Sequence, residues 1–278
     1  MRTIIKPTIS PIRTFVRCYS SFRIETKNNY RNIAGFIATS SIDYDRKGNA
    51  KTLYTFPVHT PHSYVQGNIL KEDMVKLYNK KMVGHKTGRK VYDKLMTLPE
   101  LGICPFCGIG EIEGLDHYLP ESKFPTFSVL PYNLVASCNK CNKGKLTDYA
   151  TRQNKQTLHP YYDNFNTVQW LFAKVLRTSP VTIEFYVNPP TPWTQVNKDR
   201  VQAHFNNYGL AQRFSLKAAS NLAKLRYKFT QYYTSPIDIV SELKNEYQSY
   251  RSLHLNSWET AMYQALYQDP WYYNGGYV

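Results

Sequence analysis

The sequence predicts an α+β protein in which a small core built around cysteine pairs is flanked by a basic N-terminal region and a mostly helical C-terminal region. Apolar residues recur at helical spacing on both sides of residues 99–150, whereas residues 181–187 alternate between apolar and polar side chains, as a strand does. Four of the five cysteines lie in two Cys-x-x-Cys pairs between these regions. A chain of 278 residues is long enough for one large or two modest domains with a real core.

The N-terminal part, residues 1–98, combines an irregular segment with a helical one. Residues 1–65 lack a helical period, and their apolar runs alternate with turn-forming pieces, so short strands and loops are expected there. Pro7 and Pro11 interrupt any amphipathic helix at the start, which favours an ordinary basic segment over a mitochondrial transit peptide. Helices are expected near residues 68–97, where an apolar stripe is formed by Leu70, Met74, Leu77, Tyr78 and Met82 and is followed by Val91, Tyr92, Leu95 and Met96.

The C-terminal part, residues 151–278, is predicted to be α-rich, with one strand near residues 181–187. Four helical periods follow that strand, and they cover residues 201–208, 214–229, 239–247 and 258–266. Ser235 and Ser257 supply start signals for the last two helices. The aromatic tail at residues 271–273 is too apolar to float free, so we expect it to dock on this part or on a partner.

The central part, residues 99–150, carries the two cysteine pairs, which are Cys104-Pro-Phe-Cys107 and Cys138-Asn-Lys-Cys141. Two such pairs suit one tetrahedral Zn²⁺, because each supplies two sulfurs from a tight turn. Only Cys18 is left over, so the cysteines do not form a disulfide framework, and a reducing, cytoplasmic location is expected. The sequence has no run of 18 apolar residues, and we therefore expect no membrane partner.

Chemically active side chains lie between and just after the two pairs. Asp116 and His117 are adjacent, Asn133 follows in the same loop, and Asn142 and Lys145 come directly after the second pair. A structural zinc ribbon needs neither a carboxylate nor an imidazole. Hydrolysis of a phosphodiester needs both kinds of group, because a divalent cation neutralises the charge that develops and a histidine takes the proton of the attacking water.

The stretch from Cys104 to Lys145 resembles the HNH endonuclease family in its zinc-stapled ββα-metal form, because all of these motifs occur in the family's order. The resemblance implies a ββα-metal core with Asp116 as a metal ligand, His117 as the general base and Asn133 as a residue that orients this base across the loop. Asn142 takes the position of the family's last letter, which is histidine in many members. Asn139 lies nearby as the less favoured alternative. A carboxylate and an amide favour Mg²⁺ or Mn²⁺, separate from the structural Zn²⁺.

The charge of the chain points to DNA as the partner. Lysines and arginines number 35 against 20 acidic residues, which gives a net charge of +15. On the resemblance, Lys145 would contact a phosphate beside the cut, and Lys143 is the weaker candidate for this role. The helical segment adds a basic cluster, and its members proposed to bind the DNA backbone are Lys80, Lys81, Arg89 and Lys90.

The leading hypothesis is therefore a metal-dependent DNA endonuclease. Its layout is similar to HNH effectors of bacterial phage-defence systems such as Septu and certain retrons, which usually act beside an ATPase or another defence-system subunit. The alternative is a non-catalytic zinc module that binds nucleic acid or a protein. A restriction or homing enzyme is a third possibility, but no helix-turn-helix or zinc-finger array is visible after the cysteine pairs.

Overall fold

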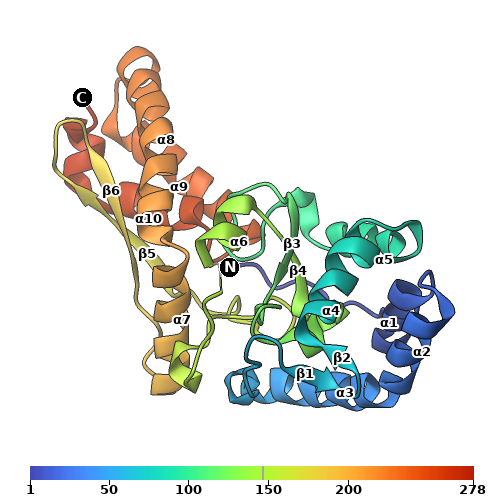
Figure 1. The fold of residues 1–278 in the computed structure, drawn as a ribbon. Coiled ribbons are helices and arrows are strands. Elements are labelled where there is room, and N and C mark those ends of the chain that lie inside the picture. Colours follow the sequence, from blue (N-terminus) through green and yellow to red (C-terminus); the bar gives the residue numbers. More distant parts are fainter. Residues whose placement is uncertain (146) are drawn as a thin grey trace. The chain divides into compact units, whose positions relative to one another are not determined.

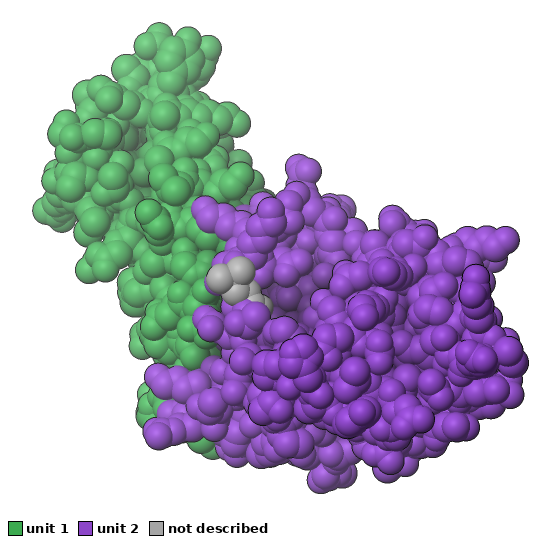
Figure 2. Space-filling view, viewed as in Figure 1, with its two compact units in different colours: residues 1, 164–278 green, residues 2–163 purple. Residues whose placement is uncertain are grey.

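The computed structural model describes residues 1–145 and 147–278, and these form two compact units (Figures 1 and 2). Unit 2 contains residues 2–163, and unit 1 contains residue 1 and residues 164–278. The predicted N-terminal and central parts therefore share one unit, and the boundary falls after Asp163 rather than at residue 150. Contacts within unit 2 explain this, because Asp163 pairs with Lys51 at 3.4 Å and its carbonyl accepts a 2.9 Å hydrogen bond from Thr3.

Unit 2 is mixed α and β. Its helices are α1 (Pro11–Tyr19), α2 (Ile24–Asn32), α3 (Ala34–Ala50), α4 (Lys71–Lys76), α5 (Lys86–Met96) and α6 (Asn139–Lys145). Its strands form two antiparallel pairs, β1 (Tyr64–Gln66) with β2 (Ile69–Leu70) and β3 (Gly114–His117) with β4 (Leu134–Ser137). Side chains from α1 to α5 and from the second strand pair share one apolar core. The α+β class is confirmed.

The expectation of strands and loops in residues 1–65 was wrong for most of this segment, because α1, α2 and α3 lie there. Helix α1 begins at Pro11, whose missing N–H costs nothing at the first helical position, and Ser10 caps it by accepting from the N–H of Arg13. Helix α3 escaped detection because its buried stripe includes Ser41 and Gly48 beside Ile37 and Tyr44. Gly48 is needed there, since a Cβ would lie 2.6 Å from the ring of Tyr162.

The helices expected near residues 68–97 are confirmed. Helix α4 continues into a π-helical turn at Leu77–Val83, and α5 follows after Gly84. The carboxylate of Asp73 accepts from the N–H of Leu70 at 3.1 Å and so caps the start of α4. The predicted apolar stripe is the face that is buried against the core of unit 2.

Unit 1 is built on one antiparallel hairpin. Its strands are β5 (Leu171–Leu176) and β6 (Thr182–Val187), and its helices are α7 (Gln195–Asn207), α8 (Leu210–Tyr232), α9 (Pro236–Leu253) and α10 (Trp258–Gln268). The predicted strand is confirmed as β6, and all four predicted helices are present with Ser235 and Ser257 as caps. Helix α10 packs on β5 and α8 packs on β6. Within the described residues, no helix has the length and apolar character needed to cross a membrane.

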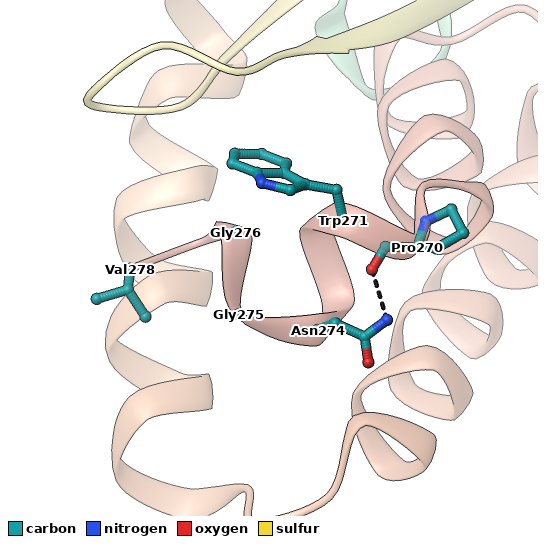
Figure 3. A pocket seen from close by; sticks show the side chains of 6 residues that line it. All are labelled: Pro270, Trp271, Asn274, Gly275, Gly276 and Val278. Atoms are coloured by element: carbon teal, nitrogen blue, oxygen red, sulfur yellow. Dashed lines mark hydrogen bonds between the residues drawn. The ribbon is translucent and has the colours of Figure 1, made fainter.

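The aromatic tail packs on its own unit, which is one of the two alternatives that the sequence left open. Tyr272 is buried, and the ring of Tyr277 lies 5.4 Å from that of Phe229 on α8. The tail also borders a shallow pocket, lined by Pro270, Trp271, Asn274, Gly275, Gly276 and Val278 (Figure 3). The Asn274 amide in this pocket already donates to the Pro270 carbonyl at 2.7 Å.

Candidate functional site

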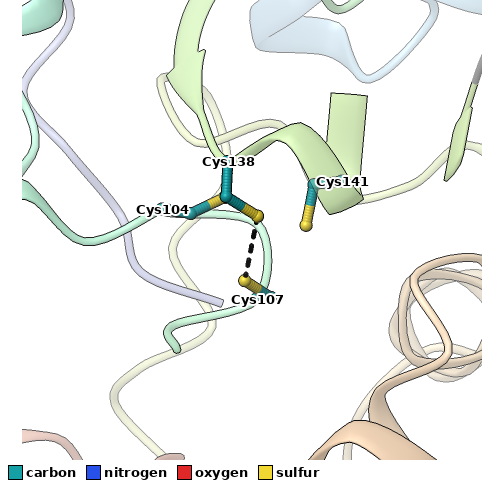
Figure 4. Close-up of side chains that lie close together, drawn as sticks. All are labelled: Cys104, Cys107, Cys138 and Cys141. Atoms are coloured by element: carbon teal, nitrogen blue, oxygen red, sulfur yellow. Dashed lines mark hydrogen bonds between the residues drawn. The ribbon is translucent and has the colours of Figure 1, made fainter. Parts of the chain in front are cut away.

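The four paired cysteines form a buried cluster (Figure 4). Their sulfur atoms all lie within 4.8 Å of one another, and Sγ of Cys107 is 3.8 Å from Sγ of Cys138. Four sulfurs at about 2.3 Å from a central Zn²⁺ would be separated by about 3.8 Å along each edge of the tetrahedron. None of the four cysteines forms a disulfide within the described residues. The cluster therefore fits a structural zinc site that has no open coordination position, as the sequence predicted.

The backbone around the cluster explains its shape. The first pair lies in a tight turn, in which the Cys104 N–H donates to the Gly110 carbonyl at 2.7 Å and the Gly108 N–H donates to the Cys104 carbonyl at 2.8 Å. Gly108 has a φ of +70°, a conformation that favours glycine. Gly110 packs against the second pair, since a Cβ there would lie 2.7 Å from Sγ of Cys138. Both glycines are thus required by the geometry of the cluster.

The second cysteine pair begins where β4 passes into α6. Cys138 follows the last residue of β4, and Cys141 lies in the first turn of α6. Hydrogen bonds from Cys104 and Cys141 lower the pKa of Cys138 to about 6, although the bond with Cys107 opposes this shift, and hydrogen bonds with the other thiols also lower the pKa of Cys107. Hydrogen bonds among the same thiols raise the pKa values of Cys104 and Cys141, so thiolate, the form that binds zinc, is favoured at Cys107 and Cys138.

Strand β3 ends in the Asp116–His117 pair. The strand lies beside β4 and α6 (Figure 1). Asp116 pairs in register with Val135, and α6 contacts β3. The Glu113 carboxylate accepts from the backbone N–H of Asn139 at 3.1 Å and from its side-chain amide, and this ties the start of α6 to the start of β3. The second cysteine pair therefore anchors the helix that faces the Asp-His pair.

His117 is held in one orientation. Its Nε2 atom lies 2.8 Å from the Ser128 carbonyl, and because a carbonyl only accepts, Nε2 carries the proton of the neutral ring. The lone pair is therefore on Nδ1, which has no hydrogen-bond partner within residues 1–145 and 147–278. Burial lowers the pKa of His117 to about 4, although the bond to Ser128 opposes the shift. A neutral, fixed imidazole with its lone pair on Nδ1 is the form that a general base requires.

Asp116 is nearly inaccessible, and Lys145 of α6 is its partner. The lysine Nζ lies 3.3 Å from both carboxylate oxygens of Asp116 and also donates to the His117 carbonyl. Burial raises the pKa of Asp116 and lowers that of Lys145, and the attraction between the two charges opposes both shifts. Lys145 therefore points inward, toward Asp116.

Asn142 lies one turn before Lys145 on α6, so both side chains leave the same side of the helix. Asn142 is half-buried, whereas Lys143 is exposed. A carboxylate and an amide are hard oxygen donors of the kind that Mg²⁺ takes together with waters and substrate oxygens. Asp116 and Asn142 are therefore chemically suited to a divalent cation, whereas the four thiols are suited to zinc.

Asn133 is fully buried and fastens the loop that follows the Asp-His pair. Its side-chain carbonyl accepts from the Leu119 N–H at 2.7 Å and from the Tyr44 hydroxyl at 2.9 Å, and its amide donates to the carbonyls of Leu119 and Phe127. The expected bond across the loop is therefore present. It reaches the backbone of the loop, and the histidine ring itself is held by Ser128.

Sequence reasoning missed Glu121 and Ser128. Oε2 of Glu121 lies 3.6 Å from Nε2 of His117 and has no hydrogen-bond partner in the described part of the chain. Burial raises the pKa of Glu121 to about 7, and a hydrogen bond with Asn79 opposes the shift. Pro120 and Glu121 resemble an ordinary turn in the sequence, and only the folding back of the loop brings them to the histidine. No local signal announces this contact.

The predicted basic cluster is only partly free to bind a phosphate. Lys80 and Lys90 are exposed and make no ion pair within the described ranges. Lys81 donates to a serine hydroxyl in the loop after α1, and Arg89 pairs at 2.7 Å with the aspartate one turn later on α5. Lys80 and Lys90 are therefore the stronger candidates of the four.

The sequence is similar to protein ea31 of Escherichia phage lambda, with 37% identity over 170 residues. The aligned region covers 59% of this chain and 57% of the phage protein, so the chain spans only a little over half the length of this relative. The name of that protein states no activity. No known family matches the sequence, and no solved structure matches the fold.

Proposed function

We propose that the chain is a metal-dependent DNA endonuclease of the HNH type, with β3, β4 and α6 as its ββα-metal core. The single observation that carries this proposal is the arrangement of α6 over the end of β3. Lys145 of α6 contacts the buried carboxylate of Asp116 and the backbone of His117, whose neutral ring is oriented by Ser128. The same helix carries the amide of Asn142 and starts within the second cysteine pair. A zinc module that only binds a partner has no need for this combination.

In the proposed mechanism, Asp116 and Asn142 would hold a Mg²⁺ or Mn²⁺ ion. When bound, the ion would neutralise charge on the phosphate and on the leaving 3′ oxygen. His117 takes the proton of the attacking water at Nδ1, because Nε2 is occupied by its bond to Ser128. Asn133 does not contact the His117 ring, and it orients the ring indirectly by holding the loop that contains Ser128 close to β3.

The zinc cluster is proposed to act structurally. Its second pair fixes the start of α6, so zinc binding would set the distance between Asn142 and Asp116. Because zinc-binding energy is folding energy in such sites, loss of the ion would unfold the core rather than slow one step.

The biological setting is proposed to be conflict between phage and bacterium. We propose a cytoplasmic effector of anti-phage defence that acts with an ATPase or another defence subunit. The relative in phage lambda favours a second setting, in which such a protein acts on behalf of a phage.

A non-catalytic zinc module remains the second candidate function. The ion pair between Asp116 and Lys145 favours it, because a carboxylate already neutralised by a lysine can serve the fold alone, without a metal. Incubation of the zinc-loaded protein with supercoiled plasmid separates the two. The endonuclease predicts nicked or linear DNA with Mg²⁺ or Mn²⁺, no product with a chelator of these ions, and a large loss of activity in Asp116→Ala. Intact plasmid under every metal condition, with DNA still bound, would support the binding module.

A further inference from the structure

Lys145 stands where a divalent cation would approach Asp116. Its ammonium group is equidistant from the two carboxylate oxygens at 3.3 Å, so it lies in front of the carboxylate rather than to one side. It also donates to the His117 carbonyl. The side chains of Lys145 and Asp116 are only 11% and 6% exposed, so solvent does little to screen the pair.

The other lysines of α6 behave differently. Lys140 and Lys143 are exposed, and neither makes an ion pair among the described residues. Burying an ion pair is costly, and truncating one partner leaves an uncompensated charge. Lys145 is therefore the resident counter-ion of Asp116, a position that no other lysine of the helix takes.

A divalent cation and this ammonium group compete for the same charge. Mg²⁺ binds at about 2.0–2.1 Å from a carboxylate oxygen. The Lys145 ammonium lies directly in front of both oxygens, so it blocks this position. Two cations beside one carboxylate in a shielded site repel each other strongly. Metal binding at Asp116 therefore requires Lys145 to move away.

We propose that Lys145 is a displaceable internal counter-ion that couples metal binding to phosphate binding. This inference rests on the proposed function, because it takes Asp116 as the metal ligand. Without DNA, the ammonium neutralises Asp116 and keeps the affinity for divalent cations low. A substrate phosphate attracts the ammonium away, which frees the carboxylate for the metal.

The side chain is suited to this exchange. Lysine carries a compact charge on a flexible four-carbon stem, so its ammonium can swing between two anions without movement of the helix. Asn142 keeps its place one turn earlier on the helix, because the exchange needs no movement of the backbone. Linkage makes the effect reciprocal, so DNA strengthens metal binding by the same factor by which metal strengthens DNA binding.

The test is the affinity for Mn²⁺, measured by calorimetry on zinc-loaded protein with and without a DNA duplex. All variants carry His117→Ala, so that the duplex stays intact. We expect this parent protein to bind Mn²⁺ at least about tenfold more tightly when DNA is present. Lys145→Met, which keeps the length of the stem but removes the charge, should bind Mn²⁺ at least about tenfold more tightly without DNA and should show a smaller effect of DNA. Lys143→Met, the matched control on the same helix, should match the parent without DNA.

Asp116→Asn in the same background separates the two proposals. If it abolishes Mn²⁺ binding while Lys145→Met binds no more tightly than the parent, the counter-ion role is overturned and the metal site stands. If Asp116→Asn leaves Mn²⁺ binding unchanged, the metal site and the proposed function fall together. Zinc content and a cooperative thermal transition verify folding, and Lys145→Gln provides the same comparison if the methionine variant does not fold.

Discussion

Gly110 lies against the cysteine cluster, and replacing it with alanine perturbs the zinc site without removing a ligand. The new Cβ would lie 2.7 Å from Sγ of Cys138 and 2.8 Å from its Cβ. Contacts of a Cβ essentially never fall below 3.0 Å, so the sulfur must retreat by at least 3.0 − 2.7 = 0.3 Å, and by 0.7 Å to reach an ordinary contact of 3.4 Å. Zinc–ligand distances tolerate only about ±0.2 Å. Cys138 therefore cannot both avoid the methyl group and stay bound in the present geometry.

The magnitude follows from the cost of overpacking. Such clashes typically cost about 1–3 kcal/mol, which corresponds to about a 5- to 150-fold loss of zinc affinity if the strain is relieved when the ion leaves. Competition with a chromophoric chelator measures that affinity, and thermal unfolding at fixed zinc should show a lower melting temperature. Gly35→Ala is the matched control in the same unit, because a Cβ there meets nothing within 4 Å. Wild-type zinc affinity in Gly110→Ala would refute the geometry argued for the cluster.

Three further predictions follow from the same structure. Asn133→Ala removes four buried hydrogen bonds and should lower the free energy of unfolding by about 2–4 kcal/mol in denaturant titrations, and a loss below about 0.5 kcal/mol would contradict its role in holding the loop. Cys138→Ser should lose zinc and the folded central core together, as seen by elemental analysis and circular dichroism, and a stable zinc-free variant would show that the cluster is incidental. Replacing Lys80 and Lys90 with alanine should weaken binding to every DNA sequence alike. The slope of the logarithm of affinity against the logarithm of salt concentration should flatten by about one unit for each phosphate that the variant no longer neutralises. An unchanged slope would exclude this face from the DNA interface.

The sequence predicted those parts of the fold that depend on local pattern. The period-two alternation of β6, the apolar stripes of α8 to α10 and the serine caps all describe interactions within a few residues. Helix α3 was missed because part of its signal lies outside that range, since Gly48 on its buried face packs against Tyr162. Helix α1 was missed although its cap is local, because a proline can either interrupt a helix or occupy its first position, and Pro11 does the latter.

The same division holds for the site. The four zinc ligands could be predicted from the two cysteine pairs, because the spacing within each pair places two sulfurs in one tight turn. The contacts of His117 with Ser128 and Glu121 arise only when the intervening loop folds back on β3. The inward turn of Lys145 depends on how α6 packs on β3, so a pattern of basic residues cannot distinguish it from the exposed Lys143.

The central claim is that His117 performs a chemical step on bound DNA. The most direct measurement is the single-turnover rate of plasmid cleavage by His117→Ala in Mg²⁺ or Mn²⁺, with DNA affinity measured on the same preparation. Loss of a general base predicts a rate about 10²- to 10⁴-fold lower with an unchanged dissociation constant for DNA, because the imidazole acts only in the transition state. Cleavage by His117→Ala at the wild-type rate, with wild-type DNA affinity, would contradict the account.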